Sequence, residues 1–340
     1  MPDPANDPSG ILNHVLERFQ SLDVTGEIMI QDAHYKGTPN SDIHRGRWRR
    51  RDDKLVAVRQ LRSYGFSDLT ELHKSIALEL RLWARLSHPN VLPLLGYCLN
   101  FGPYPALISE WMENGTVLEY LEKNKLADRF QMIQGVASGL HYLHEHDVVH
   151  SDLKCANVVV SPQGVPLLMD FGLSRLLVIS SVIKTTKEMG GTLRWMAREC
   201  FTGSDDDTLE ERPTIATKET DIWALGVTAM EIITGELPYA SAKSSGQIVA
   251  DVISGKLPYK RAQGMDERLW RICAQCWSPI PSARPSMFEV VRALQGMQKT
   301  EEKCSQLIRG GMKSSIENVI QKFSTSSRWE VYCGSSVRRQ

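Results

Sequence analysis

Residues 150–157 read HSDLKCAN, and residues 170–172 read DFG. Carboxylate and amide oxygens are the ligands that Mg2+ prefers in proteins. A positioned carboxylate can also take a proton from a hydroxyl group, and a fixed cation can neutralise developing negative charge. The two stretches supply these residue types a short distance apart in the chain: Asp152, Lys154, Asn157 and Asp170.

The two stretches resemble the eukaryotic protein kinases, whose catalytic loop reads H-R-D-L-K-x-x-N and whose metal-binding turn reads D-F-G. The resemblance covers roughly residues 26–298. It implies that Asp152 orients the acceptor hydroxyl and takes its proton, and that Lys154 neutralises the transferring phosphoryl group. It also implies ATP and Mg2+ as cofactors, with Asn157 and Asp170 as the metal ligands.

Three later stretches match further markers of the same family. GTLRWMARE (191–199) resembles the end of the activation segment, although Arg198 stands where the family has the proline of A-P-E. DIWALG (221–226) resembles the buried helix whose aspartate anchors the catalytic loop. SARP (282–285) supplies Arg284, which in the family pairs with the glutamate of A-P-E, here Glu199. These matches speak against a small-molecule phosphotransferase, which shares only the catalytic-loop elements.

The catalytic loop and the activation segment also indicate a branch of the family. Lys154 and Thr192 resemble the serine/threonine type, whereas RWMA (194–197) resembles the tyrosine kinases. Together they are typical of the tyrosine-kinase-like branch, with serine and threonine as the expected acceptors. Ser151 replaces the arginine of H-R-D, which predicts that control by phosphorylation of the activation loop is weak or absent. Serines and threonines still lie where phosphosites occur in the family: Ser180, Ser181, Thr185 and Thr186.

Residues 55–61 read LVAVRQL and are typical of a β-strand. Period-2 alternation places Arg59 on the same face as Ala57. The family sequence here is V-A-I-K, so the resemblance implies that Ala57 covers the adenine and that Arg59 stands where a lysine meets the α- and β-phosphates. Glu79 holds the position of the helix glutamate that pairs with this lysine. An arginine is a wide planar fork suited to carboxylates, so a guanidinium clamped on Glu79 would reach the phosphates poorly or crowd them.

The phosphate-covering loop departs further from the family. It reads KGTPNSDI (36–43), and counting back from Ile43, which holds the position of the loop's last valine, places the three glycine positions at Lys36, Thr38 and Ser41. Gly37 is off register, and Pro39 has no N–H to donate to a phosphate. Other cations nearby are not expected to take the place of the family lysine. Lys54 should face away from the site, and Lys36 would reach a phosphate only in an unusual loop conformation. Arg45 and Arg47 are expected to form a solvated strand end.

The linker between the lobes is read from LISEWMENG (107–115). By family position Ser109 is the gatekeeper, and the backbone of Glu110 to Met112 would hydrogen-bond the adenine. These assignments depend on the resemblance, because backbone contacts leave no sequence signature.

The order of predicted elements indicates an α+β, bilobal protein-kinase-like fold. It has a small β-rich N-lobe and a larger, mostly helical C-lobe, with a cleft between them. We expect a disordered segment and a short helix over 1–25, with that helix over 11–23. The kinase domain is expected over 26–298 (N-lobe 26–108, hinge 109–115, C-lobe 116–298), followed by a loosely attached polar tail over 299–340. Other expected helices are 68–86, 116–124, 129–146, 221–235, 268–277 and 288–297; expected strands lie within 26–62, 91–98, 105–112, 157–160 and 165–172, and an acidic surface loop at 204–211.

The composition is that of a globular protein without a bulk charge signal. Lys plus Arg equals Asp plus Glu at 40 each, so nothing favours nucleic acid as a partner. No apolar run approaches the length of a membrane span. The seven scattered cysteines favour reduced thiols and an intracellular, cytoplasmic location. Cys273 and Cys276 form a lone CxxC, which is expected to be two helical thiols because no second pair completes a zinc site.

Two functions remain open from the sequence. The intact catalytic and metal-binding residues favour a protein serine/threonine kinase with reduced activity. Arg59, Arg198 and the altered glycine loop favour a pseudokinase that acts as a nucleotide-binding or scaffold module. Either predicts a protein substrate or signalling partner, and neither specifies which one or the oligomeric state.

Overall fold

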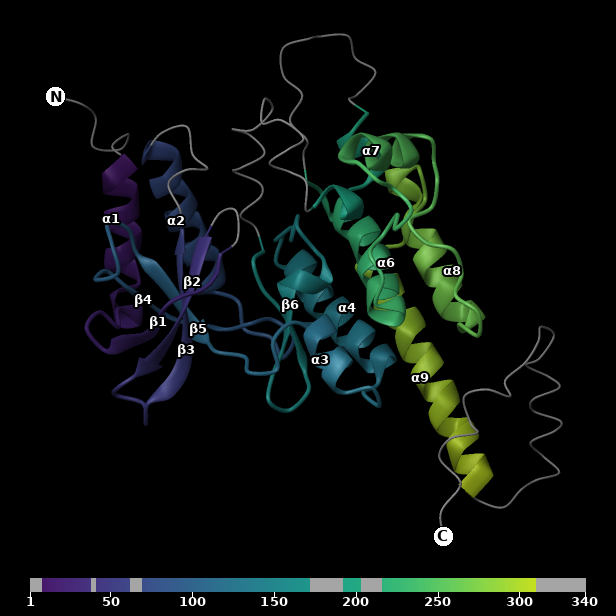
Figure 1. The fold of residues 1–340 in the computed structure, drawn as a ribbon, viewed down its shortest axis with the longest axis horizontal. Helices are drawn as coiled ribbons and strands as arrows, with labels where there is room; N and C mark the ends of the chain where they lie inside the picture. Colours follow the sequence, from purple (N-terminus) through teal and green to yellow (C-terminus); the bar gives the residue numbers. More distant parts are fainter. Residues whose placement is uncertain (1–7, 38–40, 62–68, 172–191, 203–215, 310–340) are drawn as a thin grey trace.

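The computed structural model describes residues 8–37, 41–61, 69–171, 192–202 and 216–309, and it has the expected two lobes (Figure 1). The N-lobe holds one five-stranded sheet and two helices, and the C-lobe is mostly helical. N-lobe elements are α1 (Pro8–Arg18), a 3-10 turn (Gln20–Leu22), β1 (Ile28–Gly37), β2 (Ser41–Trp48), β3 (Lys54–Leu61), α2 (Leu69–Trp83), β4 (Leu94–Cys98) and β5 (Ala106–Glu110).

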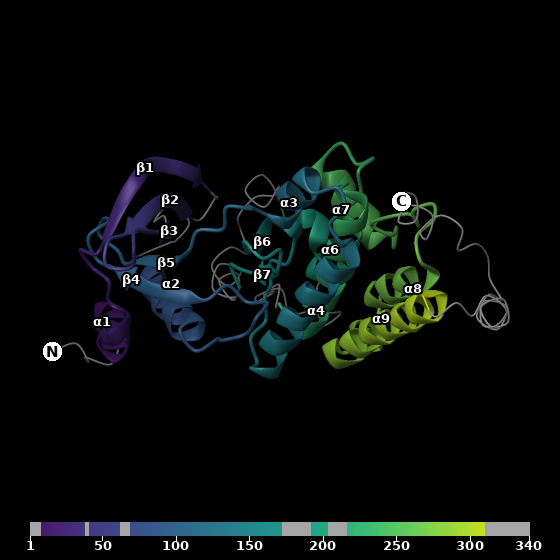
Figure 2. The ribbon, with the colours of Figure 1, turned by 90° about the horizontal axis from the view of Figure 1, so that it is seen from below.

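The C-lobe carries one small hairpin on the side that faces the N-lobe sheet (Figure 2). Its remaining elements are helices and short 3-10 turns. These elements are α3 (Val117–Lys123), α4 (Arg129–Glu145), a turn (Cys155–Asn157), β6 (Val158–Val160), β7 (Pro166–Leu168), turns (Leu193–Trp195, Arg198–Cys200), α6 (Lys218–Thr234), α7 (Ser245–Ile253), α8 (Glu267–Cys276), a turn (Pro281–Ala283) and α9 (Met287–Arg309).

The N-lobe sheet is antiparallel, in the order β1-β2-β3-β5-β4. Its register sets Arg59 between Ile43 on β2 and Leu107 on β5. Val56 and Val58 point to the opposite face, where they are fully buried in a separate apolar cluster. The alternation therefore places Arg59 and Ala57 together on the face away from that cluster, as the sequence predicts.

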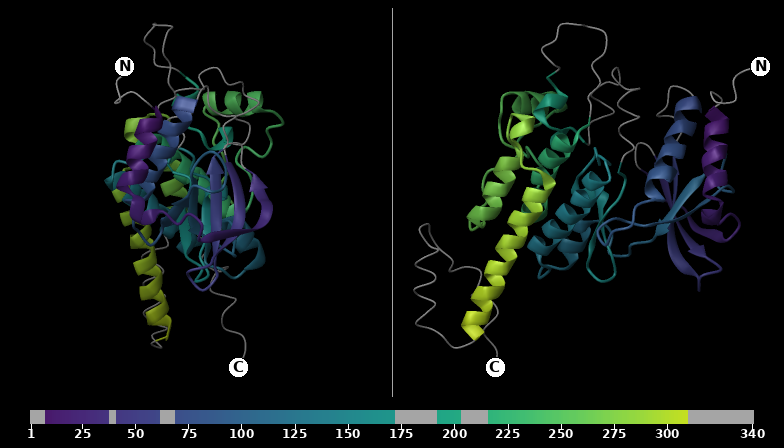
Figure 3. Two further views of the ribbon diagram at one scale, coloured as in Figure 1. Left: turned by 90° about the vertical axis from the view of Figure 1, so that its left-hand side faces the viewer. Right: turned by 180° about the vertical axis from the view of Figure 1, so that it is seen from behind.

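Helix α1 packs against α2 in the N-lobe (Figures 1 and 3). Leu12 and Val15 of α1 belong to the same buried core as Leu72 and Ile76 of α2. The helix begins and ends earlier than the expected 11–23, and a 3-10 turn follows it at Gln20–Leu22. The N-terminal helix is thus an integral layer of the N-lobe, and it adjoins the helix that carries Glu79.

The core of the C-lobe is α6, whose residues are buried on all sides because the sequence is apolar nearly all round. Thr217 caps its N-terminus, and Gly235 ends it with a left-handed φ of 71°. The sequence did not predict α7, which Ser244 caps by accepting from the N–H of Gln247 at 3.2 Å. Helix α9 continues to Arg309, past the expected boundary at 298, through a stretch rich in helix-forming Glu, Lys, Gln and Leu.

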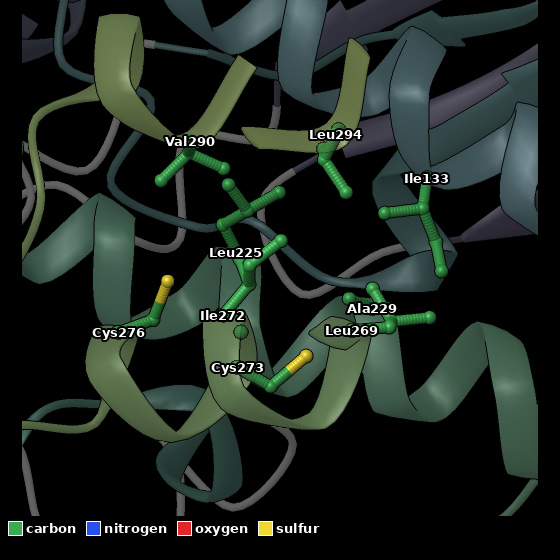
Figure 4. A pocket seen from close by; sticks show the side chains of 10 residues that line it. Ile133, Leu225, Ala229, Leu269, Ile272, Cys273, Cys276, Val290 and Leu294 are labelled. Atoms are coloured by element: carbon green, nitrogen blue, oxygen red, sulfur yellow. The ribbon is translucent and has the colours of Figure 1, made fainter. Parts of the chain in front are cut away.

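The CxxC cysteines line an apolar pocket in the C-lobe (Figure 4). Cys273 and Cys276 lie on one side of α8 and are 1% exposed. Leu225 of α6 and Leu294 of α9 are among the side chains that enclose the same pocket. Burial raises the pKa of the Cys276 thiol to about 12, which is the behaviour of an inert core thiol. This confirms the interpretation of the pair as two helical thiols, and the structure places both of them in the core.

Within the described ranges, no helix is both long and apolar enough to cross a membrane. The expected acidic loop at 204–211 and the candidate phosphosites of 180–186 lie outside the described residues, as do residues 1–7 and 310–340.

Candidate active site

Arg59 contacts two carboxylates, that of Glu79, as the sequence predicted, and that of Asp170, which the sequence did not place near it. Its Nη1 hydrogen-bonds Oε1 of Glu79, and its Nε lies 3.3 Å from Oδ1 of Asp170. The Nε also donates to the hydroxyl of Ser41 at 3.4 Å. The side chains of Arg59, Glu79 and Asp170 are only 9%, 4% and 15% exposed, so the charges meet in a nearly dry site.

The secondary structure explains why these three side chains converge. Strand β3 carries Arg59 on its inner face, and α2 carries Glu79 beside a buried stripe that includes Leu72, Ile76 and Leu80. A residue next to such a stripe must also point inward. The sequence prediction that Glu79 meets Arg59 is confirmed.

Burial and charge act against each other in this cluster. Burial works to lower the pKa of Arg59, but the negative charges of Asp170 and Glu79 outweigh it and raise that pKa, so the guanidinium stays charged. Burial also raises the pKa of Glu79, and the Asp170 charge adds to this while Arg59 opposes it. One cation therefore serves two carboxylates.

The β6–β7 hairpin brings Asn157 and Asp170 to the same end. Val158 pairs with Leu168, and the N–H of Met169 donates to the carbonyl of Asn157 at 3.0 Å. Asp170 follows directly, with a left-handed φ of 59° that non-glycine residues seldom adopt. Both residues carry side-chain oxygens of the type that Mg2+ prefers, although Asp170 already faces Arg59.

The catalytic-loop residues form a single hydrogen-bonded unit. Lys154 Nζ donates to Oδ1 and Oδ2 of Asp152 at 2.9 and 2.8 Å and to the hydroxyl of Thr192 at 2.9 Å. The side-chain amide of Asn157 donates to Oδ2 of Asp152 at 2.8 Å. The Asp152 carboxylate is thus held by two donors and remains 27% exposed, so a hydroxyl group can approach it.

Asp221 supports this loop from the N-terminus of α6. Its Oδ2 accepts from the backbone N–H of His150 at 2.7 Å, and its Oδ1 accepts from that of Ser151 at 2.8 Å. His144 Nε2 lies 2.8 Å from the same carboxylate. Asp221 therefore anchors the catalytic loop as expected. Its carboxylate holds Ser151, which adopts a left-handed φ of 67°. Burial lowers the pKa of His150, which keeps that ring neutral.

The loop has a further anchor on α6 that the sequence did not predict. It is Glu231 rather than Thr228, because the Thr228 hydroxyl donates to the carbonyl of Ala224 at 2.8 Å within the helix and lies 3.4 Å from that of Leu153. Glu231 Oε2 accepts from the N–H of Cys155 at 3.1 Å and from Trp195 Nε1 at 3.0 Å. The sequence does contain a feature from which this contact could have been predicted. The spacing of Asp221, Thr228 and Glu231 puts three polar residues along one side of an otherwise apolar helix.

The Arg284–Glu199 pair is present in bidentate geometry. The two guanidinium nitrogens lie 2.6 and 2.8 Å from the two oxygens of Glu199. Arg284 also donates to the carbonyls of Glu219 and Ser278, and its side chain is completely buried. Arg198, at the position of the family proline, lies in the short 3-10 turn beside Glu199.

The linker residues lie around the end of β5. Ser109 is buried opposite Ala57, and Met112 accepts a backbone hydrogen bond from Gly115 at 3.0 Å. Lys54 pairs with Glu110 at 2.8 Å, which agrees with the prediction that it faces away from Arg59.

Arg45 differs from the solvated strand end that the sequence predicted. Its guanidinium lies 5.7 Å from the centre of the Trp111 ring and 3.8 Å from Glu113, so it packs on the linker. The reason is the register, because β2 runs beside β3 and brings Arg45 opposite Ala57, close to the end of β5. The tip of the glycine loop, Thr38 to Asn40, and the side chain of Lys36 lie outside the described residues.

The two lobes, the Arg59–Glu79 pair and the Asp152–Lys154–Asn157 unit define a protein kinase domain. Residues 36–294 match the family model described as protein tyrosine and serine/threonine kinase. The chain therefore belongs to the protein kinase family.

Similar proteins include both serine/threonine and tyrosine kinases. A probable serine/threonine-protein kinase of Dictyostelium discoideum is 29% identical over 75% of this chain and 15% of its own length. Serine/threonine-protein kinase STY17 of Arabidopsis thaliana is 29% identical over 66% of this chain and 37% of its own. Tyrosine-protein kinase abl-1 of Caenorhabditis elegans is 31% identical over 75% of this chain and 20% of its own length. The mixture fits the tyrosine-kinase-like branch, and the chain spans less than half the length of each of these relatives.

Proposed function

We propose that this chain is a protein serine/threonine kinase that transfers the γ-phosphate of ATP to a protein hydroxyl at a reduced rate. The observation that carries this proposal is the Asp152 carboxylate, held by Lys154 and Asn157 and still open to solvent. A scaffold without catalytic function has no need of a carboxylate, a cation and an amide in this arrangement.

Each residue then has a defined chemical task. Asp152 accepts the proton of the acceptor hydroxyl, and Lys154 neutralises charge on the phosphoryl group as it transfers. Asn157 and Asp170 would hold Mg2+, which neutralises phosphate charge when it is bound. The adenine would lie against Ala57 and Ile43, with backbone hydrogen bonds from Glu110 to Met112, and Arg59, held by Glu79, would face the α- and β-phosphates.

The acceptor side is supported by a pocket beside the catalytic loop. Asp152 lines it together with Thr192, Trp195 and Met196. Because Thr192 also bonds Lys154, the segment that would hold the acceptor is linked directly to the catalytic unit. The short serine or threonine side chain is the acceptor that this arrangement favours.

A pseudokinase is the second candidate, and the Arg59–Asp170 contact favours it. An arginine occupied by two carboxylates stabilises phosphate charge less well than a free lysine. Loss of one such stabiliser typically costs about 10²–10³ in rate. Under this alternative the chain binds nucleotide and a partner without turnover.

An assay of labelled phosphate transfer from ATP distinguishes an active kinase from a pseudokinase. The acceptors in this assay are the protein itself and a generic substrate. We expect slow incorporation, as phosphoserine and phosphothreonine, that Asp152→Asn and Asp170→Ala abolish. Incorporation no greater than in Asp152→Asn would contradict kinase activity, and phosphotyrosine as the main product would contradict the expected acceptor.

A further inference from the structure

Arg59 forms ion pairs with two carboxylates, and it hydrogen-bonds only one of them among the described residues. Only Nη1 meets Glu79, and the second oxygen of that carboxylate, Oε2, is buried with no hydrogen-bond partner among the described residues. The guanidinium is therefore not clamped on Glu79 in bidentate fashion, as the sequence had suggested. Its Nε lies 3.3 Å from Oδ1 of Asp170 in an ion pair.

The residue type makes both contacts feasible. A guanidinium carries five N–H donors in a fixed plane, whereas an ammonium is a compact and strongly hydrated point charge. Arg59 can thus hold Glu79 through one nitrogen and Asp170 through another at the same time. Ser41 accepts from the same Nε and completes the contacts on that side.

The contact falls on a residue expected to be a metal ligand. A divalent cation that binds Asp170 must displace Nε or lie next to a permanent positive charge, in a site where little water screens the repulsion. At the same time, a phosphate that enters the site meets a cation already fixed in place.

We propose that Arg59 competes with Mg2+ for Asp170, so that this chain binds ATP almost equally well with and without a divalent ion. The inference rests on the nucleotide site of the proposed function. It adds that the fixed guanidinium takes over part of the charge neutralisation that the metal would supply. Arg59 is thus the residue that sets the metal dependence of nucleotide binding.

The test compares the dissociation constant of ATP in EDTA with that in excess Mg2+, by calorimetry, for wild type, Arg59→Lys and Arg47→Lys. Arg47→Lys is a matched control because it makes the same chemical change on β2, where the Arg47 side chain donates to the carbonyl of Asp53 at 3.3 Å in an exposed position. The ratio of interest is the dissociation constant in EDTA divided by that in excess Mg2+. We expect this ratio to be below about 3 for wild type and Arg47→Lys, and above about 10 for Arg59→Lys.

A ratio above about 10 for wild type, equal to that of Arg59→Lys, would overturn the inference. Failure of the wild-type chain to bind ATP either in EDTA or in excess Mg2+ would also overturn it. If Arg59→Lys does not fold, Asp170→Asn decides. The affinity of this variant for ATP in excess Mg2+ should lie within about threefold of wild type, and a loss above about tenfold would overturn the inference. Phosphate incorporation on the same samples tests the proposed function separately, because an inactive chain can still give a ratio near one.

Discussion

Arg59, Glu79 and Asp170 form one nearly buried cluster in which a single cation meets two carboxylates. Removing one partner of a buried ion pair leaves a charge without compensation, which is far more costly than losing an exposed pair. In this cluster the loss of Arg59 would leave two carboxylates facing each other. The cluster therefore links the stability of the chain to the residue that we propose limits its rate of phosphoryl transfer.

Arg59→Met should lower the free energy of unfolding by about 3–5 kcal/mol at pH 7. Because burial and Asp170 already raise the pKa of Glu79, loss of Arg59 should raise it further, and the proton taken up on acidification relieves the repulsion. The deficit relative to wild type should therefore shrink as the pH falls from 7 to 5 in urea titrations. Arg50→Met, at a side chain 78% exposed, should cost less than about 1 kcal/mol at both pH values. A deficit that grows on acidification would contradict this account.

At the scale of elements, the structure depends on two helices that the kinase motifs do not mark. Helix α6 holds the catalytic loop at two places, through Asp221 and Glu231. Helix α1 precedes the residues that match the family model and packs on α2, the helix that carries Glu79. Both helices therefore influence the site through the elements that they support.

Leu12→Ala tests the contribution of α1 to the N-lobe. Leu12 is 6% exposed, and truncation of a buried leucine typically lowers the free energy of unfolding by about 2–5 kcal/mol. Leu126→Ala is the matched control, because Leu126 is fully exposed and should change stability by less than about 0.5 kcal/mol. Equal effects of the two changes in thermal or urea unfolding would show that α1 does not stabilise the lobe.

Several elements were predictable because their signals are local. Strand β3 follows from its alternation, and α6 from an apolar run too long and too uniform for a surface helix. Helix α7 was missed because it has only two buried apolar residues, Ile248 and Val252, and a serine cap. The contact between Arg59 and Asp170 could not be predicted. The two residues are far apart in the sequence and lie in different lobes, so their contact depends on how the lobes pack together. Arg45 was misplaced for a similar reason, since its environment is set by the register of β2 on β3.

At the scale of the whole molecule, the described cysteines are distributed as core residues of both lobes. Cys98 lies in the N-lobe, and Cys155, Cys273 and Cys276 lie in the C-lobe, all of them buried and free. Cys200 is partly exposed, but burial raises its pKa to about 12, as it does for Cys98 and Cys276. Since the thiolate is the reactive form, the reactivity of these five cysteines should be low.

Native alkylation with iodoacetamide at pH 8, read by mass spectrometry, tests this distribution. A thiol of pKa about 12, as for Cys98, Cys200 and Cys276, is ionised to about one part in 10⁴ at pH 8, so these three should remain unmodified. Cys155 and Cys273 should also remain unmodified, because burial raises their pKa well above the usual value. All seven should react after unfolding in guanidinium chloride. Rapid native modification of Cys273 or Cys276 would contradict the packing of α8 against α6 and α9.

The proposed function requires an assembled phosphoryl-transfer site whose rate is limited by the residue at position 59. The most direct measurement is labelled phosphate incorporation by wild type and Arg59→Lys, each relative to Asp152→Asn. The account predicts slow incorporation by wild type and a rate higher by about 10² in Arg59→Lys, because a lysine frees a cation for the phosphates. Incorporation by Arg59→Lys that is no faster than wild type would contradict it.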